Sequence, residues 1–175
     1  MENEKKLSEY LGKSLILTQP KFWGRDYQLK CEEQILAIIS YPKWYSSDFE
    51  VSWDKNKWFI YHPSMWRSKI EIKEVDKQLP FASYQKVRFK SDGILDLPMG
   101  QQLKLHFKYF RSSYEVQNSA GECLVLIKDK FSFKDKTEIY IQQKSELIDK
   151  YPWVILLAWY VSAQRKRRSG VAAAN

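Results

Sequence analysis

The sequence predicts a mainly β protein, a closed antiparallel barrel of roughly 12 strands that encloses a C-terminal hydrophobic α-helix. Short strand-like runs recur from residue 14 to residue 142, and turn residues separate them. Residues 152–161 (PWVILLAWYV) are apolar on every side of a helix, so this helix must be buried. Because about 20 apolar residues are needed to cross a bilayer, we expect the preceding strands to bury it.

Length and composition indicate one domain. The chain has 175 residues, 44% of them hydrophobic and 15% aromatic, which suits a single domain with a sizeable core. We place this domain at residues 14–168. Residues 1–13 are expected to be a polar N-terminal lead-in, and residues 169–175 (SGVAAAN) a flexible tail.

Alternating and β-branched or aromatic runs predict strands at residues 14–19, 26–31, 34–40, 48–53, 57–62, 68–73, 81–90, 93–97, 102–110, 112–117, 122–128 and 137–142. Turn residues lie between them, such as Asp54-Lys55-Asn56 and Asn118-Ser119-Ala120-Gly121. This spacing is typical of an up-and-down meander, and closing so long a sheet removes its edges.

A weak internal repeat supports this count. Tyr27 and Leu29 are followed by Leu36 and Ile38 in the first half, and Tyr114 and Val116 are followed by Leu124 and Leu126 in the second. Each unit is predicted to be a three-stranded meander. Such repetition suggests a sheet built from similar pieces.

The final helix is predicted at about residues 150–166. Pro152 is tolerated in the first turn, where its missing N–H costs nothing, so the helix start is expected between residues 149 and 151. A start at Ser145 is the alternative, and it would put Pro152 inside the helix and kink it. A barrel of roughly 12 strands leaves room inside, and this helix would fill it.

This organisation resembles the tubby C-terminal-like superfamily, which includes tubby domains, phospholipid scramblases and the LURP-one-related proteins. The resemblance covers nearly all of residues 14–168 and rests on KWYSSDFEV (residues 43–51), YEVQNSAGECLVLIKDKFSFKDKTEIYI (residues 114–141) and the final apolar helix. It implies a closed barrel around a central hydrophobic helix. Tubby domains bind phosphoinositides through exterior basic residues and scramblases associate with membranes, but no headgroup-binding residue is carried over to this chain by position.

The charge favours anionic partners. The formal net charge is +8, and basic residues alternate with apolar ones in two predicted strands: Lys86, Arg88 and Lys90, and Lys104, His106 and Lys108. If these strands were neighbours, they would form one basic outer face able to bind an anionic lipid headgroup. The alternative is an ordinary solvated barrel exterior.

A second basic cluster follows the apolar helix: Arg165, Lys166, Arg167 and Arg168. Next to an apolar segment such a cluster indicates a membrane-proximal position, with anionic lipid as the partner. The alternative is a helix C-cap with a basic end, since cations are favoured there.

Catalytic and metal motifs are absent from the sequence, so we predict a non-enzymatic protein without a cofactor or metal. His62 and Ser64 could pair, but they have no third partner and no nucleophile-elbow context. Cys31 and Cys123 are expected to be reduced thiols. Met1 is not followed by an apolar run before Leu15, so a cytoplasmic location, peripheral to the membrane, is expected.

Three functions are open at this point. The first is a tubby-like binding module for anionic phospholipid or phosphoinositide headgroups. The second is a structural or protein-interaction domain whose charge serves solubility. The third is a membrane-inserted, scramblase-like protein. Nucleic acid is not indicated, because no RRM, OB or helix-turn-helix signature occurs. In a barrel the aromatic side chains more often pack the core and the barrel mouths. Trp44, Tyr45 and Trp66 lie nearest to turns and are the candidates for an exposed patch beside the basic strands.

Overall fold

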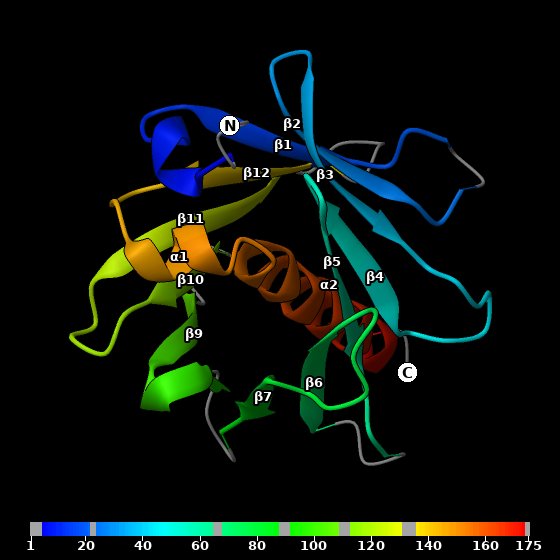
Figure 1. The fold of residues 1–175 in the computed structure, drawn as a ribbon. Helices are drawn as coiled ribbons and strands as arrows, with labels where there is room; N and C mark the ends of the chain where they lie inside the picture. The colour runs from blue at the N-terminus through cyan, green and yellow to red at the C-terminus, as the bar shows by residue number, and fades with distance from the viewer. Residues whose placement is uncertain are drawn as a thin grey trace.

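The computed structural model is a closed antiparallel barrel with a helix through its centre (Figure 1). It describes residues 5–21, 24–64, 68–87, 92–108, 113–130 and 136–173, and the side chains of residues 129–130 and 166–173 are not described. Within these residues every strand pairs with its neighbours in sequence, and the first strand pairs with the last. The predicted fold class is confirmed.

The described part of the chain contains all of the predicted strands in the predicted order. They are β1 (Ser14–Thr18), β2 (Tyr27–Cys31), β3 (Gln34–Ser40), β4 (Phe49–Trp53), β5 (Asn56–Tyr61), β6 (Lys69–Glu74), β7 (Ala82–Lys86), β8 (Gly93–Asp96), β9 (Gln102–Lys108), β10 (Ser113–Gln117), β11 (Cys123–Lys130) and β12 (Lys136–Ile141). Alternate residues face inward, as Leu15 and Leu17 do in β1.

The two meanders of the internal repeat share an irregularity. The register shifts between Leu29 and Lys30 where β2 pairs with β3, and between Val116 and Gln117 where β10 pairs with β11. Leu29 and Val116 are the matching positions of the two repeats. A bulge bends its strand and increases the local twist, so both halves of the barrel curve at equivalent points.

The apolar helix is buried inside the barrel. Residues from Trp153 to Ala158 have no exposed surface, and Trp159 and Tyr160 are buried as well. These side chains meet the inward-facing residues of the strands: the ring of Trp159 lies 4.7 Å from that of Tyr27, and the ring of Tyr160 lies 4.7 Å from that of Phe49. The prediction that the barrel encloses this helix is confirmed.

The bounds of the helix differ from the predicted 150–166. A short helix, α1 (Glu146–Lys150), is followed by a break, and α2 (Val154–Ala173) then begins anew. Pro152 lies in the break, because it has no N–H to continue the helical hydrogen bonds. The helical segment therefore begins at the alternative start, Ser145, and not between residues 149 and 151, and it is interrupted at Pro152. At the other end, α2 continues through residues 169–173, which were expected to form part of a flexible tail.

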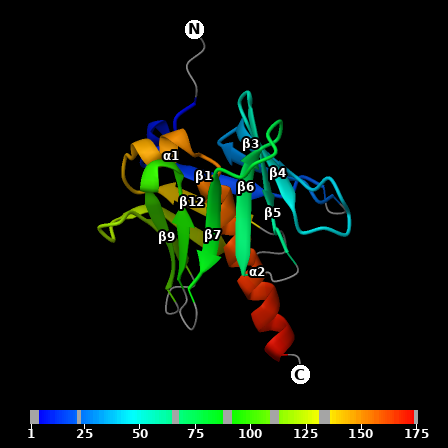
Figure 2. The same ribbon diagram turned by 60° about the horizontal axis from the view of Figure 1, so that its bottom comes forward.

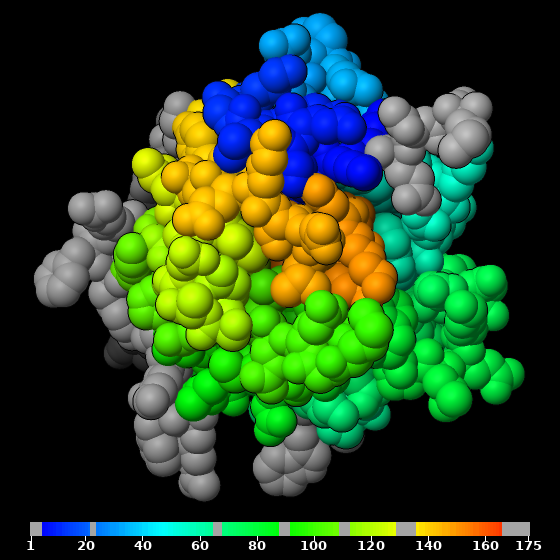
Figure 3. Space-filling view, turned by 60° about the vertical axis from the view of Figure 1, so that its left-hand side comes forward, coloured from blue at the N-terminus to red at the C-terminus, as the bar shows by residue number. Residues whose placement is uncertain are grey.

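The two ends of the barrel differ, as Figure 2 shows. One end, called here the closed end, is covered by α1 and by η1 (Leu7–Tyr10). Asp149 of α1 holds η1: its Oδ1 accepts the backbone N–H of Ser8 at 2.7 Å, and its Oδ2 accepts the hydroxyl of Ser8 at 2.6 Å. The N-terminal segment and α1 lie against each other in Figure 3. Because Leu7 is fully buried, this part of the expected polar lead-in belongs to the core.

At the other end, called here the open end, α2 leaves the barrel (Figure 2). A 20-residue helix is about 30 Å long, which is more than a strand of five or six residues can enclose. Burial of α2 is complete at Tyr160 and becomes partial by Ala163. The open end is therefore where the helix, the loops and solvent meet.

Candidate functional site

The predicted basic face is not one surface. β8 lies between β7, which carries Lys86, and β9, which carries the other described cations. Lys86 is opposite Gly93, and Gly93 is opposite the buried Leu105. Directly opposed residues point to the same side of a sheet, so Lys86 is on the inward side of β7, although it is itself exposed at the end of the strand. Lys104, His106 and Lys108 are on the outward side of β9. The strands are not neighbours, and the expected face is corrected accordingly. Arg88 and Lys90 lie outside the described residues.

The outward cations of β9 have acidic partners. Asp92 lies 3.0 Å from the ammonium of Lys104 and 2.6 Å from Nδ1 of His106. Lys108 contacts Glu115 at 2.5 Å. Partial burial raises the pKa of both Asp92 and Glu115, but hydrogen bonds from their basic neighbours outweigh it and hold each pKa below its usual value. This part of the exterior is consequently charge-compensated.

The basic cluster of the helix is described only in part. Arg165 is half-buried and its guanidinium carbon lies 4.2 Å from the centre of the Phe107 ring, a cation–π contact between α2 and β9. The helical backbone continues through Lys166, Arg167 and Arg168, whose side chains lie outside the described residues. These three residues follow the buried part of α2, at the end where the helix leaves the barrel.

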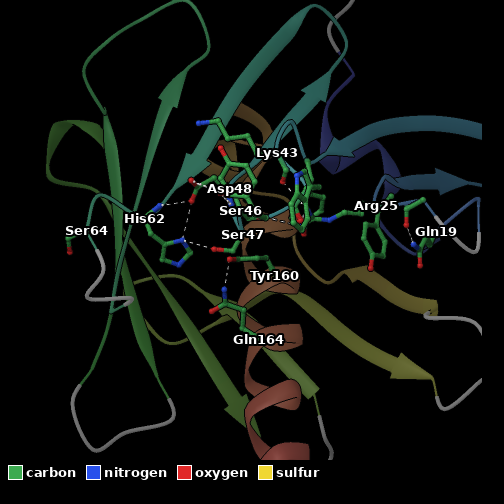
Figure 4. Close-up of a pocket in the computed structure, with 15 residues that line it drawn as sticks. Gln19, Arg25, Lys43, Ser46, Ser47, Asp48, His62, Ser64, Tyr160 and Gln164 are labelled. Atoms are coloured by element: carbon green, nitrogen blue, oxygen red, sulfur yellow. Dashed lines mark hydrogen bonds and ion pairs between the residues drawn. The ribbon is translucent and has the colours of Figure 1, made fainter.

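A cavity of about 770 Å³ lies at the open end beside α2 (Figure 4). Its volume falls within the range of sites for small molecules. Its walls come from the start of β2 and the segment before it, from the β3–β4 loop, from the residues after β5 and from one side of α2. The lining residues are Gln19, Gly24, Arg25, Tyr27, Tyr41, Lys43, Trp44, Tyr45, Ser46, Ser47, Asp48, His62, Ser64, Tyr160 and Gln164.

Arg25 fixes the shape of the β3–β4 loop. Its guanidinium donates to the backbone carbonyl of Lys43 at 2.9 Å, to that of Ser46 at 2.8 Å and to that of Trp44. The same group lies 4.7 Å from the centre of the Tyr41 ring. The planar, fork-shaped guanidinium can serve several acceptors and a ring face together, which a lysine cannot do. The loop is therefore held in position at the cavity before any ligand arrives.

The far end of this loop is fixed by Asp48. Its Oδ1 accepts the backbone N–H of His62 at 3.0 Å and lies 3.4 Å from Nδ1 of the same residue, while its Oδ2 accepts the hydroxyl of Ser46 at 2.8 Å. Ser47 Oγ lies 3.5 Å from that same Nδ1. A catalytic triad needs the serine and the acid on opposite ring nitrogens, so this arrangement does not form one.

The second nitrogen of His62 has a different environment. The His62 side chain is 8% exposed, and its Nε2 is buried with no hydrogen-bond partner among the described residues. The contact between His62 and Ser64 that was considered from the sequence is not present as a hydrogen bond among the described residues, although both side chains line the cavity. A buried polar atom without a partner is costly, and such atoms mark sites that a ligand can complete.

Two aromatic side chains stand out from the rim of the cavity. Trp44 is 83% exposed and Tyr45 is 70% exposed, and their rings meet edge to face at 5.7 Å. Both were candidates for an exposed patch because they lie beside a turn, and both are exposed, but they lie on the β3–β4 loop and not beside β7 or β9. Trp66, the third of that group, lies outside the described residues.

Other site residues were not found from the sequence. Arg25 and Asp48 act through contacts between loops that are distant along the chain, and no local motif marks them. Tyr160 and Gln164 belong to the enclosed helix, and Gln164 donates to the hydroxyl of Tyr160 at the cavity wall. Only the change from apolar to polar residues after Val161 indicated that α2 reaches an opening there.

The described residues contain no group of three or more His, Cys, Asp or Glu side chains that could hold a metal ion. Cys31 and Cys123 are free thiols. Burial first, and the nearby Glu115 second, raise the pKa of Cys123 to about 11, so this thiol is poorly reactive. Among the described residues, no helix has an apolar stretch that could cross a membrane.

The fold and the cavity define a closed β-barrel with an enclosed helix and a polar, aromatic-rimmed cavity at one end. Comparison with family models, with curated proteins and with solved structures finds no match for this chain.

Proposed function

We propose that this protein is a non-enzymatic binding module of the tubby-like kind that docks on membranes containing anionic phospholipid. The docking surface is the open end of the barrel. The observation that carries this proposal is the pair Trp44 and Tyr45, both strongly exposed beside Lys43 on a loop that Arg25 holds in place. Aromatic side chains with a polar edge are enriched where membranes meet water.

Charge supports the same end of the molecule. Lys43 lies on the rim, and the sequence Arg165–Arg168 follows where α2 emerges. Each basic residue near an anionic membrane surface contributes about 1 kcal/mol of attraction. The basic residues at the open end are better candidates for binding an anion than those of β9, because the β9 cations already have acidic partners.

The closed barrel around an apolar helix supports placing the chain among the tubby-like proteins. The apolar part of α2 is buried inside the barrel, so this helix does not support the third function, a membrane-inserted, scramblase-like protein. The charge compensation on β9 favours the second candidate, a structural or protein-interaction domain whose charge serves solubility.

Vesicle co-sedimentation distinguishes the two candidates. We expect the protein to bind vesicles of phosphatidylcholine with added phosphatidylserine, to bind phosphatidylcholine alone poorly, and to dissociate as salt is raised. Trp44→Ala and Lys43→Ala should each weaken binding. Leu79→Ala, which changes an 80% exposed apolar side chain at the closed end, is the control and should bind like the unchanged protein. Absence of binding to anionic vesicles at low salt would reject the module and leave the second candidate.

A further inference from the structure

The cavity behind the docking loop has the wrong chemistry for a bare phosphate. Asp48 places a carboxylate in its wall, and this side chain remains 29% exposed with its hydrogen bonds to Ser46 and His62 in place. A carboxylate offers roughly four lone-pair positions, and up to three are used here, by the backbone N–H of His62, the hydroxyl of Ser46 and Nδ1 of His62 at 3.4 Å. The free lone-pair position of this carboxylate repels an anionic oxygen and favours a ligand that carries hydrogen-bond donors.

His62 adds a second acceptor at the same place. Its Nδ1 faces Asp48 and Ser47, and a proton on Nδ1 shared with Asp48 leaves a lone pair on Nε2. That Nε2 has no hydrogen-bond partner in the described part of the chain, and its side chain is more than nine-tenths buried. A donor from a ligand in the cavity would remove the cost of this buried, unpaired atom.

The net charge of the lining sets the charge of that ligand. Arg25 and Lys43 bring two cations to the cavity, against one carboxylate, Asp48. An ammonium donor would meet both cations, whereas a hydroxyl donor brings no positive charge. The lining therefore fits a ligand with one net negative charge whose donors are hydroxyl groups.

We propose that this cavity selects anionic lipids whose headgroups carry hydroxyl groups, of which phosphatidylglycerol is the simplest. The phosphate lies at the rim near Lys43, and the headgroup hydroxyls donate to Asp48 and to Nε2 of His62. This inference rests on the proposed membrane-docking function and adds the class of headgroup. Arg25 contributes by holding the loop, so the cavity is formed in advance.

The test compares two lipids of equal charge. Phosphatidylglycerol and phosphatidylethanol each carry one negative charge, but only the first has hydroxyls on its headgroup. We expect vesicles with phosphatidylglycerol to bind about two- to tenfold more tightly, the ratio that one net hydrogen bond supplies. Equal affinity for the two vesicles overturns the inference while leaving the docking function intact, whereas absence of binding to both rejects the docking function itself.

Two variants assign the preference to the cavity. Asp48→Asn replaces an acceptor by an amide, and Ser47→Ala is a milder change beside His62 should the first variant unfold. Each should lower the ratio of affinities for phosphatidylglycerol and phosphatidylethanol vesicles toward one, whatever its effect on docking in general. If both variants keep the full preference for phosphatidylglycerol, the cavity is not its source. Equal affinity of the unchanged protein for phosphatidylserine vesicles, whose headgroup carries an ammonium group, also contradicts the assignment.

Soluble glycerol 1-phosphate distinguishes a lipid from a free phosphate ester. It carries the same hydroxyls without the acyl chains, so it should displace the protein from phosphatidylglycerol vesicles when in excess. If it binds the protein but does not compete with the vesicles, the lipid assignment is overturned.

Discussion

Shortening one leucine of the enclosed helix measures how much the barrel depends on it. Leu156 is fully buried, so Leu156→Ala removes three carbon atoms from a position that strands surround on all sides. Loss of apolar burial and the cavity left behind together cost about 3–5 kcal/mol at such positions. Because domains of this kind are stable by only about 5–15 kcal/mol, the change should be large.

Leu79→Ala is the matched control, since the same atoms are removed from a side chain that is 80% exposed. Its cost should stay within about 0.5 kcal/mol. Urea unfolding followed by tryptophan fluorescence gives both values, and an unchanged slope with denaturant would show that the unfolded states are comparable. If the two variants lost equal stability, Leu156 would not be enclosed and the architecture would have to be revised.

Three further predictions concern single contacts. A Cβ atom at Gly93 would lie 2.2 Å from the ring of Tyr84, so Gly93→Ala should cost about 1–3 kcal/mol in urea unfolding, and adding Tyr84→Ala should reduce that cost. Asp92 has a lowered pKa in the folded protein, so its ionised form stabilises the fold. This stabilisation is fully present above the pKa of the carboxyl in the unfolded chain and is lost as the pH falls through the pKa of the folded state. The difference in unfolding free energy between the unchanged protein and Asp92→Asn should therefore shrink on acidification. Arg25→Lys should speed amide exchange in the β3–β4 loop by roughly tenfold, because one ammonium cannot replace the guanidinium at three carbonyls, while strand amides stay unchanged.

The strands and the buried helix could be predicted because their signals are local. Alternation of period two and turn residues mark each strand, and an all-round apolar run marks an enclosed helix. The break at Pro152 was harder, because the same residue is compatible with the first turn of a helix and with an interruption.

The candidate site was less predictable, because it depends on which loops meet. Arg25 and Asp48 gain their roles from the β3–β4 loop and from His62, and neither contact follows from sequence spacing. Lys86 was expected to face outward, because Lys86 and Arg88 alternate with the apolar Val87. The buried Tyr84 before it decides the matter instead, because it fixes the inward side of β7.

The pairing of β1 with β12, and the place of α2 after all the strands, have a consequence for synthesis. The ribosome makes β1 first, and it makes β12 and α2 last. The strands made early therefore emerge before the helix that fills the interior of the barrel. Long-range pairing of this kind forms slowly and leaves apolar surface uncovered meanwhile. The nascent protein should therefore expose the apolar faces of its strands until β12 and α2 have emerged from the ribosome, and should then close in a single cooperative step.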